Sequence, residues 1–224
     1  MIQLPRLYAI VDASFFPAAK ELILHCEELI AAGCTVLQYR NKSGNARIML
    51  EQARELRKLF GAQDQNPHVS QNQRAMGHPP PHAPKLIMND RADLCLAAEF
   101  DGVHIGQDDL SPESVRKIIG PERWLGVSTH NPEQLEQADR TSADYLAIGP
   151  VFSTSSKDKP DPVGGLEGVR LARQLTRKPL VAIGGITRAN AASVIEAGAD
   201  AVAVISDLVR EPRKSAEEFF RIFR

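Results

Sequence analysis

The chain has 224 residues, of which 43% are hydrophobic, and its formal net charge at pH 7 is −1. This apolar content is enough for a sizeable core, which excludes wholesale disorder. The charge argues against a general binder of nucleic acids or anionic membranes, because such proteins usually carry a basic excess. A local basic site for a small anion is compatible with it.

The sequence predicts neither a membrane span nor a disulfide framework. No apolar run reaches the roughly 18 residues that a membrane-spanning helix needs. The first residues lack the charged start and long apolar stretch of a signal peptide. Cys26, Cys34 and Cys95 are odd in number and lack CxxC spacing, which is typical of free thiols in a reducing compartment. We therefore expect a soluble, cytoplasmic protein.

Short apolar runs typical of strands alternate along the chain with segments of helical periodicity. The predicted strands are residues 7–12, 35–40, 85–90, 102–106, 124–129, 145–150, 179–186 and 201–207. The clearest helix follows the second strand, where Met49, Ala53, Leu56 and Phe60 fall on one face. Gly61 is expected to end that helix.

Two later helices are predicted to begin at SPE (111–113) and NPE (131–133), each with a capping residue, a proline and an acid. Strands such as YLAIGP and AVAVIS are near-continuous apolar runs, typical of a parallel sheet covered by helices. Eight strand–helix units predict an α/β fold, a single (β/α)8 TIM barrel over residues 1–224. The alternative is a doubly wound open sheet, but DASFFPA after the first strand lacks its glycine fingerprint.

One segment, at about residues 62–84, interrupts this alternation of predicted strands and helices. It is rich in proline, glutamine and asparagine and contains His68, His78 and His82. A flexible insertion is favoured over a metal-binding tract. Because the segment follows a helix and precedes a strand, we expect it on the N-terminal face of the barrel, away from the usual site.

Polar residues gather where the predicted strands end. In a TIM barrel the C-terminal strand ends and the following loops form the active site. Gln38, Arg40 and Lys42 end the second strand, and Gln38 and Arg40 share one of its faces because they differ by two. Asn89 and Asp90 end the third strand. The repetition of this pattern along the chain predicts a functional site.

Two aspartates suit a hard cation. Asp90 and Asp109 follow neighbouring strands, which lie about 4.8 Å apart. Two carboxylates together with substrate phosphate oxygens usually hold Mg²⁺ in proteins. Asp108 is an alternative to Asp109 on spacing alone. His104 and His130 are candidate acid–base groups, with a core hydrogen bond and a helix start as their alternative roles.

Other residues suit phosphate. Arg40, Lys42 and Lys157 are candidates for a diphosphate cluster beside the cation. Barrels frequently bind phosphate in the loops after the seventh and eighth strands, where this chain has Gly185 and Ser206. A glycine there lets backbone N–H groups approach an anion closely.

Several motifs, in their order, resemble the thiamine-phosphate synthase (thiamine-phosphate pyrophosphorylase) family. They are LQYRNK, MNDRADL, GVHIGQDDL, GVSTH, IGPVFSTSSK, AIGGIT and VAVIS. The resemblance runs from about Leu7 to Asp207, apart from the interrupting segment. It implies a Mg²⁺-dependent transferase of thiamine biosynthesis. Such an enzyme couples 4-amino-2-methyl-5-hydroxymethylpyrimidine diphosphate to 4-methyl-5-(2-phosphoethyl)thiazole, or its carboxylated form, by dissociative substitution, and forms thiamine phosphate and diphosphate.

The resemblance also implies roles for individual residues. The catalytic residues gripping diphosphate would be Arg40, Lys42, Ser128 and Lys157. Gln38 and Asn89 would contact the pyrimidine, and Asp90 and Asp109 would hold Mg²⁺. The thiazole-phosphate side would consist of Thr154, Ser156, Gly185, Ile205 and Ser206. The loop at residues 149–160 would thus serve both anions.

The chain departs from the family pattern at Asn41, where an acid is common, and at Ser153 and Ser156, which replace a proline and a threonine. Neither departure is expected to abolish function. A thiazole tautomerase relying on His130 and a non-catalytic phosphate-ligand sensor are the alternatives, but neither needs the cations and both aspartates together. We expect small-molecule substrates as partners, without nucleic acid or membrane, and leave a homo-oligomer open.

Overall fold

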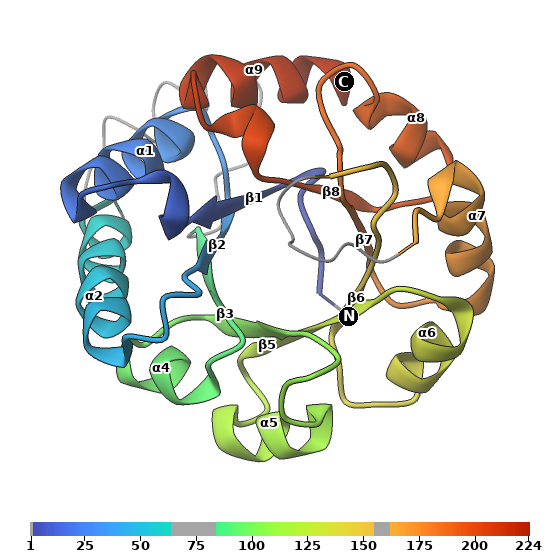
Figure 1. Cartoon of the computed structure of the whole chain (residues 1–224), viewed down its shortest axis with the longest axis horizontal. Helices are drawn as coiled ribbons and strands as arrows, with labels where there is room; N and C mark the ends of the chain where they lie inside the picture. The colour runs from blue at the N-terminus through green and yellow to red at the C-terminus, as the bar shows by residue number, and fades with distance from the viewer. Residues whose placement is uncertain (1, 64–83, 155–161) are drawn as a thin grey trace.

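The computed structural model of the chain describes residues 2–63, 84–154 and 162–224. Its eight strands pair in parallel in chain order, and β8 pairs with β1 to close a barrel. Helices form a ring outside the strands (Figure 1). The predicted (β/α)8 TIM barrel is therefore confirmed. Within the described residues, no helix combines the length and the apolar character that crossing a membrane requires.

The strands are β1 (Leu7–Asp12), β2 (Val36–Arg40), β3 (Lys85–Asn89), β4 (Gly102–Ile105), β5 (Trp124–Thr129), β6 (Tyr145–Ile148), β7 (Leu180–Ile183) and β8 (Ala201–Val204). The helices are α1 (Ala19–Ala31), α2 (Ala46–Gln63), α4 (Ala92–Ala97), α5 (Pro112–Ile119), α6 (Pro132–Asp139), α7 (Gly165–Leu175), α8 (Ala191–Glu196) and α9 (Pro212–Ile222). Two 3-10 turns, η1 (Ala13–Phe15) and η2 (Ser206–Leu208), follow β1 and β8.

The strand β1 shows how the sequence builds two buried layers. Leu7, Ala9 and Val11 belong to the core between the strands and the helices. Tyr8 and Ile10, at the alternate positions, belong to the second core inside the barrel. Because both faces of such a strand are covered, its sequence is apolar throughout instead of alternating.

The predicted helix starts are confirmed, and one predicted helix end is wrong. Ser111 Oγ accepts a hydrogen bond from the Ser114 backbone N–H at 3.3 Å, where α5 begins. Asn131 does the same for Gln134 at α6, at 2.9 Å. In contrast, α2 continues past Gly61 to its last residue, because a glycine weakens a helix without removing a backbone hydrogen bond.

Three strands end two or three residues earlier than predicted. The predicted strands 145–150, 179–186 and 201–207 correspond to β6, β7 and β8, which end at Ile148, Ile183 and Val204. Beyond these points the chain turns, as at Gly185 with φ of +62° and at the start of η2. The apolar residues after the strand ends thus belong to loops that shape the site.

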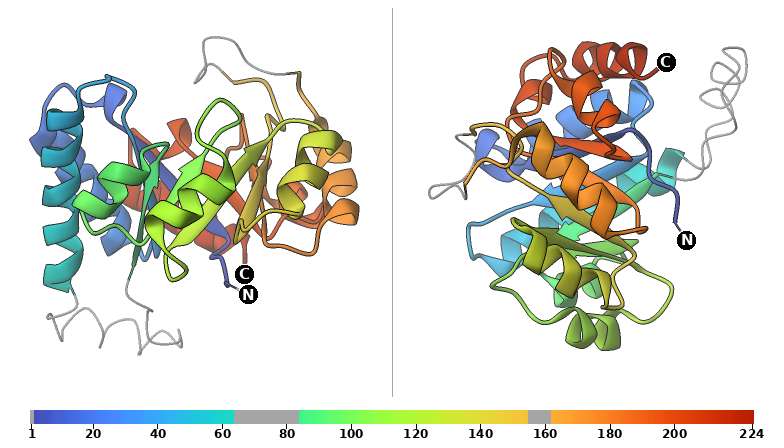
Figure 2. Two further views of the ribbon diagram at one scale, coloured as in Figure 1. Left: turned by 90° about the horizontal axis from the view of Figure 1, so that it is seen from below. Right: turned by 90° about the vertical axis from the view of Figure 1, so that its right-hand side faces the viewer.

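The predicted insertion at about residues 62–84 lies almost entirely outside the described residues. The end of α2 and the start of β3, which flank it, lie at the end of the barrel opposite the C-terminal ends of the strands (Figure 2).

Candidate active site

A cavity of about 1120 Å³ opens at the C-terminal end of the barrel. It brings together most of the predicted site residues: Gln38, Arg40, Lys42, Asn89, Asp90, Asp109, Ser128, Thr154, Gly185, Ile205 and Ser206. The two other predicted residues, Ser156 and Lys157, lie outside the described residues.

Arg40 is held at the rim of this cavity by an ion pair with Asp12. The two residues are register partners at the ends of β2 and β1. The Asp12 side chain is only 4% exposed, and its Oδ1 also accepts the Ser14 backbone N–H at 3.0 Å. A carboxylate so buried requires its partner, because an unpaired buried charge is costly. Asp12 therefore fixes the position of the Arg40 guanidinium.

Asp90 and Asp109 approach one another from the ends of β3 and β4, as their spacing predicts. Asp90 has a φ of +63°, rare for a residue with a side chain, and its N–H donates to the His104 carbonyl at 2.8 Å. Asp109 Oδ2 accepts the Gly106 N–H at 2.7 Å. Partial burial of its carboxylate raises the pKa of Asp109, and the nearby Asp90 carboxylate raises it further. The Gly106 N–H and the Lys42 cation act in the opposite direction and lower this pKa.

This carboxylate pair fits a magnesium ion. Its ligand atoms are hard oxygens, which Mg²⁺ prefers. In this structure the Lys42 ammonium contacts Asp90. Within the part of the chain that the structure describes, no group of three or more His, Cys, Asp or Glu residues could hold a metal. Two carboxylates with water and substrate oxygens are nevertheless the usual setting for Mg²⁺.

A chain of hydrogen bonds crosses the barrel interior from the cavity wall at β2 to that at β5. Gln38 Nε2 lies 2.9 Å from the Tyr8 hydroxyl, which lies 2.8 Å from the Tyr145 hydroxyl. His104 Nδ1 lies 3.1 Å from the Tyr145 hydroxyl, and Nε2 lies 2.8 Å from Ser128 Oγ. The chain thus links two predicted substrate-binding residues through three buried side chains.

The Gln38 amide sets the direction of this chain. Because Nε2 donates to Tyr8, the arrangement that gives every hydroxyl proton in the chain an acceptor has Tyr8 donating to Tyr145 and Tyr145 donating to His104 Nδ1. Burial lowers the pKa of His104 to about 4, so the ring is neutral near pH 7, and in this arrangement its single proton is on Nε2. The Nε2–H then donates to Ser128 Oγ, which leaves the Ser128 hydroxyl proton for a ligand in the cavity.

Gly126 on β5 makes room for the centre of this chain. A Cβ atom at Gly126 would lie 2.1 Å from Tyr145 Cζ and 2.4 Å from His104 Nδ1. No side chain fits there without displacing the tyrosine or the histidine.

The other cavity wall is formed by the loops after β6, β7 and β8. Gly185, with its left-handed backbone, packs so closely on the β6 loop that a Cβ would lie 2.4 Å from the Ser153 carbonyl oxygen. Its own carbonyl accepts a hydrogen bond from Asn190 Nδ2 at 3.1 Å. Ser206 and Ile205 line the same cavity after β8, so this wall combines glycines, a serine and an apolar side chain.

His130 and Asn41 have structural contacts. His130 Nδ1 donates to the Gly149 carbonyl at 2.6 Å and so joins the loop after β5 to the end of β6. Asn41 is buried, and its Nδ2 donates to the Tyr39 hydroxyl and to Gln52 Oε1, both at 3.0 Å. Tyr39 belongs to the core outside the barrel, so the departure at Asn41 lies away from the cavity.

A family model described as thiamine monophosphate synthase matches residues 69–208 of the chain. A thiamine-phosphate synthase of Koribacter versatilis is 54% identical over 224 residues, which cover 99% of this chain and 97% of that protein. The chain belongs to the thiamine monophosphate synthase family.

Further members of the thiamine monophosphate synthase family agree over most of their length. The thiamine-phosphate synthase of Chloroflexus aurantiacus is 44% identical, with 91% of this chain and 85% of that protein covered. Among solved structures, the thiamine phosphate pyrophosphorylase of Pyrococcus furiosus superposes with a TM-score of 0.76 at 32% identity, covering 97% of this chain and 94% of the other.

For this member of the thiamine monophosphate synthase family, sequence reasoning missed three residues of the site. Tyr8 and Tyr145 fall within apolar runs that predict strands, although both line the cavity and carry the hydrogen-bond chain. Asp12 falls at the end of a predicted strand. Its position beside Arg40 in neighbouring strands was the available signal, because adjacent first and second strands place these two ends together.

Proposed function

We propose that the chain is a thiamine-phosphate synthase, a transferase that joins a pyrimidine diphosphate to a thiazole phosphate and releases diphosphate. Support comes from the family and from curated relatives of that name that match nearly the whole chain. The observation that carries the proposal is the cavity itself, because one end of the barrel gathers cations, a carboxylate pair and a wall with glycines and a serine. A diphosphate leaving group and a second phosphate need these groups.

The proposed reaction needs no protein nucleophile. The bond between the pyrimidine methylene carbon and the diphosphate oxygen breaks, and its electron pair leaves with the diphosphate. The electron-rich aminopyrimidine stabilises the resulting cation, and the thiazole nitrogen then forms the new carbon–nitrogen bond. The protein contributes orientation of both substrates and fixed charges around the leaving group.

We assign stabilisation of the leaving diphosphate to the cavity walls that the ends of β2 and β5 form. Arg40, held by Asp12, and Lys42 would neutralise diphosphate oxygens together with Lys157. The Ser128 hydroxyl would donate its remaining proton to the same anion. Asp90 and Asp109 would hold Mg²⁺, which when bound neutralises charge developing on the leaving diphosphate.

The two rings of the substrates are assigned to different walls. Gln38 and Asn89 would contact the pyrimidine, because both line the cavity beside the carboxylate pair. The thiazole phosphate would lie against the loops after β6, β7 and β8. The residues proposed there are Thr154, Ser156, Gly185, Ile205 and Ser206.

The test uses the purified chain with both substrates and Mg²⁺. Diphosphate release and thiamine phosphate formation are expected in equal amounts, and both should stop when a chelator removes the metal or when the thiazole phosphate is omitted. Turnover of a thiazole tautomerase substrate without thiamine phosphate formation would overturn the assignment. We also propose a cytoplasmic, single-domain enzyme in which the 62–84 segment takes no part in the reaction.

A further inference from the structure

The wall proposed for the thiazole phosphate lies beyond the paired parts of β7 and β8. The last register pair between these strands is Ile183 with Ala203. Gly185 and Ser206 both follow this pair, so the strand ladder does not fix the distance between their loops. A phosphate bound by both loops needs that distance to be constant, because its contacts are short and directional.

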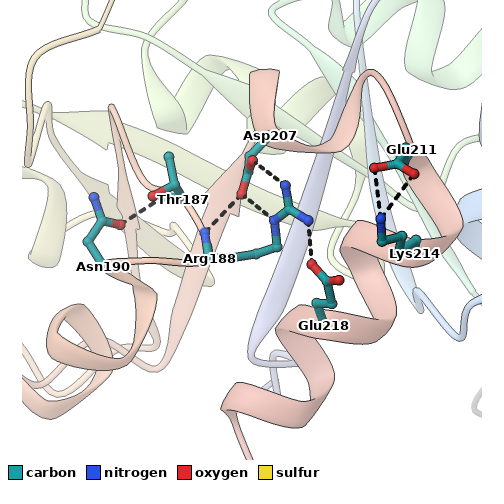
Figure 3. A network of polar contacts seen from close by, with 7 residues as sticks. All are labelled: Thr187, Arg188, Asn190, Asp207, Glu211, Lys214 and Glu218. Atoms are coloured by element: carbon teal, nitrogen blue, oxygen red, sulfur yellow. Dashed lines mark hydrogen bonds and ion pairs between the residues drawn. The ribbon is translucent and has the colours of Figure 1, made fainter.

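A side-chain contact supplies this connection (Figure 3). The Arg188 backbone N–H donates to Asp207 Oδ2 at 2.8 Å, and the Arg188 guanidinium holds both Asp207 oxygens, with Nε and Nη2 each 3.0 Å from its acceptor. Nη1 contacts Glu218 on α9. Asp207 directly follows Ser206, and Arg188 lies three residues after Gly185, so the contact joins the two loops next to the residues that face the cavity.

A second contact extends the connection back to Gly185. Asn190 Oδ1 accepts the Thr187 N–H at 2.8 Å, and Asn190 Nδ2 donates to the Gly185 carbonyl at 3.1 Å. The loop after β7 is therefore held at Gly185 by Asn190 and at Arg188 by Asp207. On its other side, the backbone N–H of Phe152 donates to the Gly184 carbonyl at 3.0 Å, which ties it to the β6 loop.

The same contacts argue against a direct role for Arg188 in binding phosphate. Its side-chain donors are directed at two carboxylates, and neither Arg188 nor Asp207 belongs to the cavity lining. The exposed fractions of their side chains are 32% and 17%, so water screens this pair only in part. A planar guanidinium that holds a carboxylate at two points fixes both distance and orientation.

We propose that Arg188 and Asp207 are positioning residues that set the spacing of the β7 and β8 loops for the phosphate of the thiazole substrate. This inference rests on the proposed function. Apart from Lys157, the residues proposed to bind the pyrimidine and the diphosphate come from the ends of β2 to β5, on the other side of the cavity. Loss of the pair should therefore weaken the binding of one substrate selectively.

The experiment compares steady-state kinetics of Arg188→Ala with the wild-type chain. We expect KM for the thiazole phosphate to rise about tenfold, with kcat and KM for the pyrimidine diphosphate changed by less than about threefold. Arg188→Lys should recover only part of the loss, since one ammonium cannot hold two oxygens in a plane. Lys214→Gln is the control. It removes an exposed ion pair between Lys214, on the helix α9 that carries Glu218, and Glu211 just before that helix (Figure 3).

Calorimetric titration with the thiazole phosphate alone separates this proposal from the proposed function. If the wild type makes no thiamine phosphate, the assigned activity fails, and weaker binding to Arg188→Ala still supports the positioning role. If the wild type is active and Arg188→Ala is less heat-stable but has unchanged KM and binding, the pair is only structural and the proposal is overturned. Should Arg188→Ala not fold, Asp207→Asn, which keeps the shape of the side chain, gives the same comparison.

Discussion

The hydroxyl groups of Tyr8 and Tyr145 lie 2.8 Å apart inside the barrel, although 137 positions separate them in the chain. Burial raises the pKa of both phenols well above the ordinary value, so each keeps its proton near pH 7 and can pass on a hydrogen bond. The pair therefore connects Gln38 on one side with His104 and Ser128 on the other.

Tyr145→Phe should lower kcat by about tenfold or more while the fold is kept. The change removes the donor to His104 Nδ1, so the histidine proton is no longer directed to Nε2 and toward Ser128. Nitrogen NMR of ¹⁵N-histidine-labelled protein should show the Nε2–H form of His104 in the wild type and a loss of this preference in the variant. Tyr39→Phe is the control, since it removes a buried hydroxyl outside the chain. Equal effects of both changes would contradict the role of the chain.

Asp109→Asn should lower kcat by about a hundredfold at saturating substrate and raise the Mg²⁺ concentration needed for half-maximal rate. One carboxylate of the pair is lost, and an amide oxygen is a weaker ligand for a hard cation. Asp108→Asn, at the neighbouring residue in the same cavity, should stay within about threefold of wild type. A magnesium titration of both variants decides which aspartate acts, and a reversed order would transfer the role to Asp108.

Gly126→Ala should lower the free energy of unfolding by about 1–3 kcal/mol or more, because its Cβ overlaps Tyr145 and His104. Gly168→Ala in α7 is the matched control. Nothing lies within 4 Å of its added Cβ, so the helix should gain up to about 1 kcal/mol. Urea denaturation of the three proteins measures both effects, and equal stability of Gly126→Ala and wild type would show that the interior repacks freely.

Stability should decrease as the pH falls from about 6.5 to about 4. Burial of the His25 side chain, on α1, lowers its pKa to about 4 from an ordinary value of 6.5. Between these values the unfolded chain binds a proton that the folded chain does not, which costs up to about 3 kcal/mol of unfolding free energy. His25→Gln should reduce the difference between unfolding free energies measured at pH 7.5 and pH 5. An unchanged difference would mean that His25 does not contribute.

Deleting residues 64–81 should leave kcat within about twofold. The end of α2 and the start of β3, which flank the segment, lie opposite the C-terminal strand ends that form the cavity. Steady-state rates and the mass in solution measure this directly. A large loss of rate in a folded variant would place part of the segment in the site or in an essential contact between copies.

The barrel could be predicted from the sequence because each strand and helix has a pattern that is visible in its own short segment of the chain. Apolar runs and caps such as Ser111 need only neighbours in the chain. It also indicated polar residues such as Asp90, since the fold requires all strands to end at one rim. It could not reveal the partners of Tyr8 or Arg188, because these depend on which atoms meet across the barrel or between two loops. The seventh strand was predicted too long for a related reason. Ile186 is an apolar residue that is buried by packing in a loop and not in a strand.

The hydrogen-bond chain has a consequence for how this molecule could arise. Its members come from β1, β2, β4, β5 and β6, so no half of the barrel contains it whole. A ribosome-bound chain lacks Tyr145 until β6 has been made, and a fragment holding the first four strands would carry Tyr8, Gln38 and His104 with the central hydroxyl missing. Catalytic competence should therefore appear late and abruptly during synthesis. In the same way, an ancestor built by duplicating a half-barrel would have had to acquire this interior layer after fusion.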